Sequence, residues 1–441
     1  YVGCGGIDGP VRLAGHHQYG IHSEHDATQG NDAAVHFIRW FFNARHGDRY
    51  GDGFGPHPHP ARCTEVVVNA QTRTVVLAAG GTGGHVFPAS ALASEMQNRG
   101  WRVVFVTDSR GGTVGGMKDV ETYHVRAGGI AGKRIIGLLR SIPELAVGTV
   151  QAWRLLRKLE PDIVVGFGGY ASVPTMLAAT RCNCRTAIHE QNAVLGRANR
   201  LMASRVDAIA TSYTSSKAIP EGAEAYVTHT GMPVRPEIVA ASNNTYPPIS
   251  DGTDVSLFVM GGSQGARVLS DVIPEAINQL DPALRSRVNV VQQCRAEDMG
   301  RVRADYQNMG VTAELNTFFG DVPERLKRAH LLIGRAGASS VYEALCIGRP
   351  AILVPYPHAV DDHQSANAYA VAAAGAGWVM DQTMFTPENL SSRLKEMISA
   401  PRVLTSAAAC AKKTGRVDAA VRLADMVERI VRGTNNNSHE G

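Results

Sequence analysis

Apolar positions from Thr74 onward alternate between two kinds of segment. Short runs rich in β-branched residues, typical of buried strands, occur first as TVVLAA, RVVFVT, DIVVGF, RTAIHE and DAIATS, and longer segments with helical potential separate them. The alternation restarts after residue 253 with DVSLFVM, VNVVQQ, VTAEL, HLLIG and PAILVP. Strands that alternate with helices are the signature of βαβ units and parallel sheets. The sequence therefore predicts an α/β protein with two similar open parallel sheets in tandem and a cleft between them.

The same pattern indicates how the chain is divided. Residues 1–70 hold eight of the sixteen histidines among Gly, Asp and Pro with almost no periodicity, so we expect an atypical extension that is disordered or spuriously included. Metal binding there is the alternative, although HPHP and GHHQYG lack ligand spacing. The remaining expected parts are a first sheet domain over 71–236, a linker rich in Pro, Asn, Ser and Gly over 237–253, a second sheet domain over 254–415 and a C-terminal helix over 416–434.

Composition narrows the classes of function. The 441 residues are 44% hydrophobic and 19% charged, as in ordinary soluble proteins, and the formal net charge of +4 is too small to argue for nucleic acid. The seven cysteines are odd in number and lack paired CxxC spacing, so we expect reduced thiols in a cytosolic protein. No apolar run approaches the roughly 18 residues of a spanning helix, and no signal sequence is visible. We therefore expect a chain that neither crosses a membrane nor is exported.

Three glycine-rich turns follow strands and lead into helices: AAGGTGGHVFP, GFGGYASVP and VMGGSQGAR. The N–H groups of such turns, together with helix N-termini, can hold an anion; the alternative is that the glycines only allow tight packing of strand against helix. A Walker A loop is excluded, because AGGIAGKR has Ala127 where Gly is needed and Arg134 where Ser or Thr is needed. A nicotinamide site has weak support, since Val86 replaces the third glycine of GxGxxG, although Asp108 lies at a fitting offset.

A denser set of polar residues lies in the second half of the chain. GRAGASSVYEA has Gly334 and Gly337 at the end of a strand and places Glu343 about two turns into the next helix. A carboxylate there can accept hydrogen bonds from a ribose diol while the loop faces phosphate; a solvated glutamate is the alternative. The loop PHAVDDHQSANA follows another strand, where open α/β sheets bind ligands, and it contains His358, Asp361, Asp362, His363 and Gln364. A metal site is disfavoured, because two histidines five apart in a loop fix no geometry.

Seven motifs, in this order and at these separations, together resemble one enzyme family: GGTGGHVFPA, GFGGYASVP, HEQNAVLGRANR, GMPVR, GGSQGAR, GRAGASSVYEA and DDHQSANA. The chain is similar to the MurG family, the N-acetylglucosaminyltransferases of bacterial peptidoglycan synthesis, over roughly Thr74 to Val431. The resemblance implies the GT-B architecture: two Rossmann-like domains, acceptor domain first and donor domain second, an active site in the cleft and a last helix that returns to the first domain. It also implies inverting transfer of N-acetylglucosamine from UDP-N-acetylglucosamine to the 4-hydroxyl of the muramoyl sugar of lipid I, which gives lipid II.

The resemblance assigns part of this chain to the donor. Glu343 would hold the ribose hydroxyls, Arg235 would lie near the diphosphate, and backbone groups at Phe319 would bond the uracil. His363 and Gln364 would contact the sugar hydroxyls, and His363 departs from the family, in which some members carry two glutamines. The donor set is completed by Thr82, Gly83, Gly84, Asn192, Ser263, Gln264 and Ala338. No tightly bound cofactor and no metal are expected, since UDP-N-acetylglucosamine is a substrate.

The acceptor side and the chemistry follow from the same resemblance. The acceptor-binding residues would be Thr82, His85, Tyr170, His189, Glu190, Gln191 and Asn192. The catalytic set would be His85, Asn192 and Glu343, with the neutral imidazole of His85 as general base for the 4-hydroxyl. A histidine that only orients the acceptor diphosphate is the alternative. Helix N-termini and Arg235 would compensate the charge of the departing UDP.

Because lipid I is anchored in the bilayer, we expect peripheral docking on the cytoplasmic face of the bacterial plasma membrane. Residues 133–158 mix Ile, Leu and Trp153 with six basic residues, which suits an anionic lipid surface. A core-facing helix with a basic outer face is the alternative. The expected partners are lipid I, this anionic surface and other cell-wall synthesis proteins, with no nucleic acid.

Three other functions stay open at this point. A related transferase that glycosylates diacylglycerol would share the donor motif but differ at GGTGGH and HEQN, both of which are present. A UDP-sugar-binding scaffold without turnover is opposed by His85, Asn192 and Glu343. A nicotinamide dehydrogenase would reveal itself by hydride transfer.

Overall fold

The computed structural model describes residues 72–80, 83–108, 120–127, 135–182, 184–262 and 266–433, with the side chains of 135–142 left aside. The expected N-terminal extension therefore lies outside the described residues, as do the expected site residues Thr82, Ser263 and Gln264. The sheets described below belong to one compact unit of the chain.

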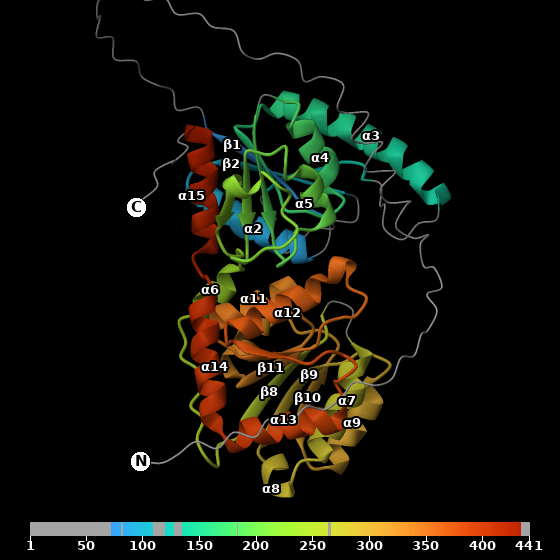
Figure 1. Cartoon of the computed structure of the whole chain (residues 1–441), viewed down its shortest axis with the longest axis vertical. Coiled ribbons are helices and arrows are strands. Elements are labelled where there is room, and N and C mark those ends of the chain that lie inside the picture. Colours follow the sequence, from blue (N-terminus) through green and yellow to red (C-terminus); the bar gives the residue numbers. More distant parts are fainter. Residues whose placement is uncertain are drawn as a thin grey trace, which may run out of the picture. The chain divides into compact units, whose positions relative to one another are not determined.

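The first half of the chain forms a seven-stranded sheet in which every neighbouring pair of strands is parallel. Its order is β3-β2-β1-β4-β5-β6-β7. The strands are β1 (Thr74–Ala78), β2 (Arg102–Thr107), β3 (Glu121–His124), β4 (Ile163–Gly166), β5 (Arg185–Glu190), β6 (Ala208–Thr211) and β7 (Val227–His229). Right-handed crossovers between parallel strands require helices on the faces of the sheet. These helices are α2 (Gly83–Asn98), α3 (Ile135–Leu159), α4 (Ser172–Ala179) and α5 (Arg197–Met202) (Figure 1).

The second half forms a six-stranded sheet, also parallel, in the order β10-β9-β8-β11-β12-β13. Its strands are β8 (Val255–Met260), β9 (Val288–Gln293), β10 (Thr312–Asn316), β11 (Leu331–Gly334), β12 (Ala351–Leu353) and β13 (Gly377–Val379). Its helices are α7 (Arg267–Asn278), α8 (Pro282–Arg285), α9 (Met299–Asn308), α10 (Val322–Arg328), α11 (Ala338–Ile347), α12 (His363–Ala373), α13 (Pro387–Ser399) and α14 (Pro401–Thr414). A 3₁₀ turn, η2 (Val360–Asp362), precedes α12, and another, η1 (Glu224–Tyr226), precedes β7.

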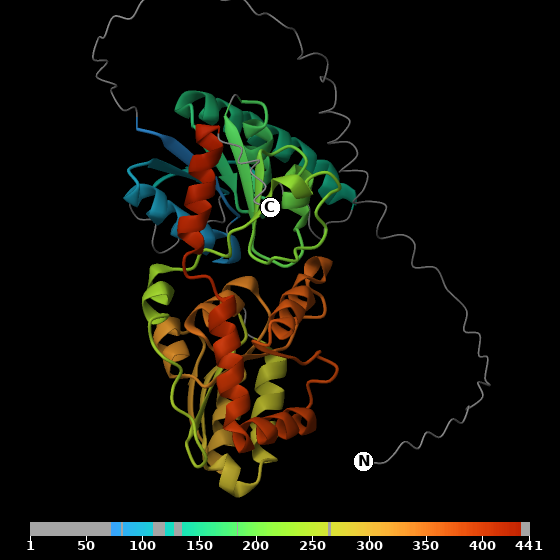
Figure 2. The same ribbon diagram turned by 60° about the vertical axis from the view of Figure 1, so that its left-hand side comes forward.

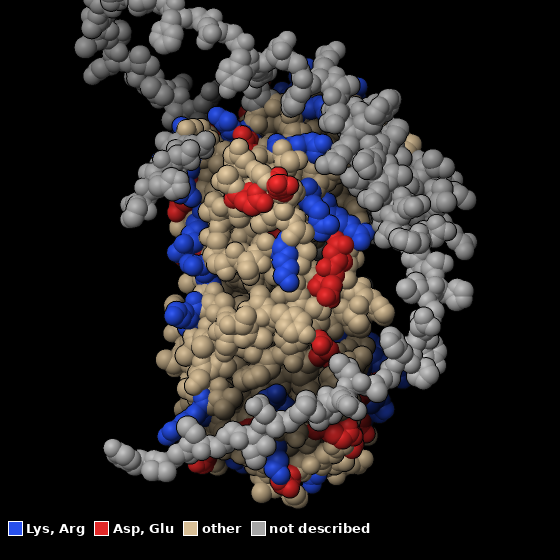
Figure 3. Space-filling model, viewed as in Figure 1, with Lys and Arg blue, Asp and Glu red and all other residues tan. Residues whose placement is uncertain are grey.

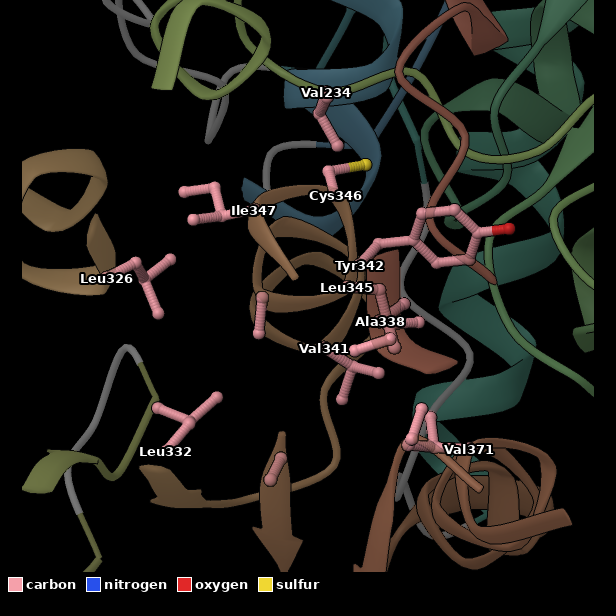
Figure 4. Packing of buried hydrophobic residues seen from close by; sticks show 14 of the residues in the cluster. Val234, Leu326, Leu332, Ala338, Val341, Tyr342, Leu345, Cys346, Ile347 and Val371 are labelled. Atoms are coloured by element: carbon pink, nitrogen blue, oxygen red, sulfur yellow. The ribbon is translucent and has the colours of Figure 1, made fainter. Parts of the chain in front are cut away.

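Both faces of the second sheet are buried. Along β8, Phe258 packs into one hydrophobic cluster while Leu257 and Val259 pack into the other, as the two-residue period of a strand requires. Helix α11 is buried at Ala338 and from Val341 to Ile347, and only Ser339 and Ser340 in its first turn are half-buried, which fits its largely apolar sequence ASSVYEALCI. Figure 4 shows Val341 and Tyr342 of this helix pointing to different sides of it within the first of these clusters.

The last helix, α15 (Ala419–Arg432), contributes to the core of the first sheet. Its buried residues Leu423, Ala424 and Val427 share a hydrophobic cluster with β1 and α2 residues. In both views this terminal red helix lies beside the first sheet (Figures 1 and 2). A short helix, α6 (Pro236–Ala241), begins directly after Arg235 and packs against α11. No helix within the described ranges is long and apolar enough to pass through a bilayer.

Three short strands at sheet edges were not expected from the sequence. These are β3, β7 and β13, each of which pairs with a single neighbour. An edge strand needs only one partner and can be polar, so ETYH in β3 shows no apolar run to detect.

Candidate functional site

Two glycine turns of the first sheet meet where the strand order reverses. Strands β1 and β4 are neighbours, so the turns that follow them lie side by side at the carboxyl edge, the usual place for ligands in such sheets. The N–H of Gly80 donates to the carbonyl of Gly168 at 3.2 Å, and a Cβ added at Gly80 would lie 3.2 Å from the Cα of Gly169. Gly168 and Gly169 have φ values of +83° and +76°. The close approach of the two turns is therefore one physical reason for these glycines.

His85 lies in the first turn of α2, directly after Gly83 and Gly84, and is half-buried. A Cβ added at Gly169 would lie 3.2 Å from its Cδ2, so the imidazole packs against the second glycine turn. Its Nδ1 lies 3.1 Å from Oε1 of Gln191. The structure thus brings together residues of two motifs that are 106 positions apart.

The carboxylate of Glu190 organises the HEQN segment at the end of β5. It is buried and accepts the backbone N–H of Asn192 at 3.0 Å and the side-chain amide of Asn192 at 3.1 Å. It also accepts the N–H of Gly196 and the side-chain amide of Asn199, both at 2.8 Å. Four donors compensate the cost of burying this charge. Asn199 was not singled out from the sequence, and its position as a buried polar group on a short helix is visible only in the fold.

His189 is fully buried in the same segment. Its Nε2 lies 3.0 Å from the carbonyl oxygen of Gly231, its Nδ1 lies 3.2 Å from Nε2 of Gln191, and its ring packs on Phe167 with centroids 5.5 Å apart. Burial lowers the pKa of His189 to about 4, so the ring is neutral at pH 7. His189, Glu190 and Gln191 all use polar side-chain atoms within the protein, and their expected contact with the acceptor stays a prediction.

Arg235 and Glu343, both expected at the donor, form an ion pair. The guanidinium approaches Oε1 of Glu343 at 2.8 Å from Nη2 and at 2.9 Å from Nε. Burial raises the pKa of Glu343, and Arg235 opposes that rise. The same guanidinium lies 5.0 Å from the ring centroid of Phe87, two residues beyond His85 on α2. Glu343 therefore belongs to the interior and not to a solvated helix face.

Asn367 is a buried polar residue next to Asn192 that sequence reasoning missed. It is fully buried on α12; its amide donates to Oδ1 of Asn192 at 3.1 Å and to the carbonyl of Ala336 at 3.0 Å. Its own oxygen accepts the N–H of Ala193 at 2.8 Å. All three hydrogen bonds span long stretches of sequence, so the only local signal was an amide among the alanines of HQSANAYA.

Further contacts join the segments that follow β5 and β6 to the second half of the chain. Arg197 pairs with Asp361 at 3.1 Å, a contact that raises the pKa of Arg197, and Tyr170 is half-buried next to that arginine. The hydroxyl of Tyr342, buried on α11, donates to the carbonyl of Ser212. Asp361 and the next residue both adopt positive φ, which shapes the start of α12.

The remaining expected donor residues lie in the second half. His363 begins α12 with Nδ1 2.7 Å from the carbonyl of Val360, and Gln364 accepts the N–H of Tyr356 at 3.0 Å. Phe319 is buried under the guanidinium of Arg325, 4.1 Å from the ring centroid, so only its backbone can serve a ligand. Ala338 is buried at the first turn of α11. Whether these residues bind the donor stays a prediction.

On the face shown in Figure 3, basic and acidic side chains of the described residues lie scattered among uncharged groups. Within the part of the chain that the structure describes, no group of three or more His, Cys, Asp or Glu side chains could hold a metal ion.

Comparison with known proteins assigns both halves to one family. Residues 75–211 match the glycosyltransferase family 28 N-terminal domain, and residues 256–423 match the glycosyltransferase family 28 C-terminal domain. The structure of this chain is similar to the crystal structure of Acinetobacter baumannii MurG, with a TM-score of 0.65, 28% identity and coverage of 81% of this chain and 99% of that one. These findings confirm the expected GT-B fold of two parallel-sheet α/β domains.

Proteins of similar sequence span nearly the same length. A protein of Rhodospirillum rubrum is 53% identical over 363 residues, which cover 82% of this chain and 93% of that protein. One of Paramagnetospirillum magneticum is 51% identical over 365 residues, with coverage of 82% and 98%. Both carry the name "UDP-N-acetylglucosamine--N-acetylmuramyl-(pentapeptide) pyrophosphoryl-undecaprenol N-acetylglucosamine transferase". The resemblance inferred from the seven motifs is confirmed.

The buried neutral state of His189 predicts a loss of stability in mild acid. The pKa is lowered from 6.5 to about 4 on folding, so the stabilising contribution is complete above pH 6.5 and is lost as the pH falls towards 4. Between pH 7.5 and 5.5 we expect the opening free energy of β5 to fall by about 1 kcal/mol from this group. This opening free energy is measured by the amide hydrogen exchange of β5 at each pH, corrected for the intrinsic exchange rates.

The matched variants for this measurement are His189→Gln, which removes the buried imidazole, and His124→Gln, which removes an exposed one from the same sheet. We expect the acid dependence to shrink only in the first. His229 also has a pKa lowered by burial and contributes equally to all three proteins, so only the differences are interpreted. An unchanged dependence in His189→Gln would refute the assignment.

Proposed function

This chain belongs to the MurG family of glycosyltransferase family 28, and on that premise we propose that it transfers N-acetylglucosamine from UDP-N-acetylglucosamine to lipid I, forming lipid II. The observation that carries the proposal is 51–53% identity to transferases of that name over more than nine tenths of their length. The acceptor hydroxyl would be the 4-hydroxyl of the muramoyl sugar, and the anomeric centre would invert. We place the reaction between the carboxyl edges of the two sheets, at the turns that follow β1, β5, β11 and β12.

His85 is the proposed general base. A neutral imidazole can take a proton from a hydroxyl, and this help is typically worth a factor of about 10² to 10⁴ in rate. Its place in the first turn of α2, beside the glycine turn that follows β4, supports this role. Asn192, whose side chain is only half-buried, is the proposed neighbour for the acceptor sugar.

Glu343 and Arg235 are the proposed anchors of the nucleotide. A carboxylate accepts hydrogen bonds from a ribose diol, and a guanidinium complements a diphosphate. Glu343 is part of α11, whose first turn follows β11, and the ion pair brings Arg235 to the same helix. The N-terminus of α11 adds a favourable field for the departing UDP, so charge compensation on this route comes from protein groups.

Docking of the enzyme on the cytoplasmic face of the plasma membrane is proposed through α3. Val147, Val150 and Trp153 are 42%, 48% and 37% exposed and follow one another at helical spacing. The guanidinium of Arg157 lies 5.0 Å from the ring centroid of Trp153 on the same face. Apolar side chains flanked by arginine suit an interface with anionic lipid.

The activity is tested with labelled UDP-N-acetylglucosamine and a lipid I analogue in detergent. We expect transfer by the full chain, a fall in kcat of about 10² or more for His85→Ala, and unchanged donor affinity. His124→Ala, an exposed histidine on the same sheet, is the matched control and should transfer normally. A folded chain that binds the donor without transfer would reject lipid I as acceptor, and a fully active His85→Ala would move the base elsewhere.

Donor binding should depend on the carboxylate of Glu343. In Glu343→Gln the charge-assisted hydrogen bonds to the ribose become neutral ones, so we expect the Kd for UDP-N-acetylglucosamine to rise by about tenfold, as measured by calorimetry. Glu324→Gln, an exposed glutamate on α10, is the control and should bind like the parent. Equal affinity of all three proteins would exclude Glu343 from the ribose site.

Membrane docking is tested by sedimentation with phosphatidylglycerol vesicles and with neutral phosphatidylcholine vesicles. We expect the full chain to prefer the anionic vesicles and the double variant Val150→Ser, Trp153→Ser to bind them at least about tenfold more weakly, because two apolar groups are lost from the contact. Val421→Ser removes a similarly exposed valine from α15 and should have no effect. Equal binding of the double variant would place the docking surface elsewhere.

A further inference from the structure

The two ring nitrogens of His85 are not equivalent in this fold. A neutral imidazole carries one proton, so only the unprotonated nitrogen can accept a proton from a hydroxyl. Which nitrogen is free depends on the hydrogen bond made by the other. The question can be answered here because the partner of His85 Nδ1 is itself held by two further groups.

Gly231, which follows β7, determines which ring nitrogen of His189 is protonated. Its carbonyl oxygen can only accept a hydrogen bond, so the nitrogen of His189 that lies 3.0 Å away, Nε2, must carry the proton. Because burial lowers the pKa of His189 to about 4, the ring is neutral at pH 7 and has no second proton. Nδ1 of His189 is therefore an acceptor.

The orientation of the Gln191 amide follows. One end of the amide lies 3.2 Å from Nδ1 of His189 and 3.1 Å from the backbone carbonyl oxygen of His189. Both of these atoms accept, so this end must be the NH₂ group; the flipped amide would place its oxygen against two acceptors. The other end, Oε1, faces Nδ1 of His85 at 3.1 Å. Gln191 is also 1% exposed, so its amide is shielded from solvent.

Since Oε1 can only accept, Nδ1 of His85 must donate. We propose that Gln191, held by His189, whose ring is in turn fixed by the carbonyl of Gly231, is a positioning residue that keeps neutral His85 in its Nδ1–H tautomer and leaves Nε2 as the proton-accepting nitrogen. The catalytic meaning rests on the function proposed above, whereas the tautomer itself does not. The chain of contacts runs from the end of β7 through β5 to α2, all within the first sheet domain.

Local geometry explains why the HEQN segment can do this. His189 lies in β5 and Gln191 is the first residue after the strand, and the 3.2 Å contact between their side chains shows that both lie on the same side of the chain. Glu190 between them uses a different set of partners and anchors the turn through Asn192, Gly196 and Asn199. The HEQN segment therefore takes part in two separate networks. Neutral hydrogen bonds through His189 and Gln191 reach His85, and the carboxylate of Glu190 holds the loop that follows β5.

The decisive measurement is the imidazole tautomer of His85 in the full chain. Two-bond and three-bond ¹H–¹⁵N correlations of histidine-labelled protein at pH 9 distinguish a protonated Nδ1 from a protonated Nε2, and loss of the signals in His85→Ala assigns them. We expect the proton on Nδ1 in the parent. A proton on Nε2 of neutral His85 would overturn the proposal whatever the variants do.

The role of Gln191 is tested by Gln191→Met, which keeps the length of the side chain but has no acceptor for Nδ1. We expect the Nδ1–H signature to be lost or mixed with the other tautomer, and kcat for transfer to fall at least about tenfold with an unchanged Kd for UDP-N-acetylglucosamine. Gln97→Met makes the same replacement at an exposed glutamine of α2 and should change neither. A retained Nδ1–H signature in Gln191→Met would refute the positioning role.

The two levels of the proposal fail in different ways. If the parent shows the Nδ1–H tautomer but transfers no sugar to lipid I, the proposed reaction is wrong and the tautomer assignment stands. If transfer is normal while His85 carries its proton on Nε2, the reaction stands and the inference about Gln191 is wrong.

Discussion

The buried carboxylate of Glu190 is the constraint on which the site depends. A charge that is removed from water must be met by several donors, and here the backbone and side chains of the nine residues that follow it supply them. Satisfying this one group bends the chain after β5 into a defined turn. In the same segment the side chain of Gln191 contacts His189 and His85, and that of Asn192 contacts Asn367. A single electrostatic requirement thus sets the geometry of most of the polar residues of the first half of the site.

The glycine turns of the two sheets are determined by a second constraint, the close approach of neighbouring backbones. In the first sheet Gly80 and Gly169 touch across the point where the strand order reverses, and in the second sheet a Cβ at Gly334 would lie 2.5 Å from the carbonyl oxygen of Met260. The glycines are required by packing, yet the same turns open onto the first turns of α2 and α11. Packing and ligand binding are therefore not competing explanations at these positions, because the turn that lets two strands come together also exposes a helix N-terminus.

The ion pair of Arg235 and Glu343 stabilises the protein interior, and it would also influence the affinity for the proposed nucleotide. Burial disfavours the ionised form of Glu343, and the guanidinium compensates for it. A nucleotide that engages both groups exchanges this pair for contacts with ribose and diphosphate, so the net gain is smaller than the new contacts alone would give. Phe87 of α2 packs on the same guanidinium, so the arginine that we propose for the donor also contacts the helix that carries His85.

The sequence alone determined the α/β class, the tandem sheets and the family, because these depend on local periodicity and on motifs that are contiguous in the chain. It also placed Glu343 two turns into a helix, as found. It could not show that Glu343 is buried against Arg235, that His189 lies in the interior, or that Asn367 links Asn192, Ala193 and Ala336. Those facts depend on residues up to 175 positions apart becoming neighbours. Which loops meet is decided by the order of the parallel strands and by the helices that connect them, and this order is a property of the tertiary structure. The tautomer of His85 belongs to the same class: it follows from hydrogen-bond donors and acceptors that the tertiary structure alone brings within reach.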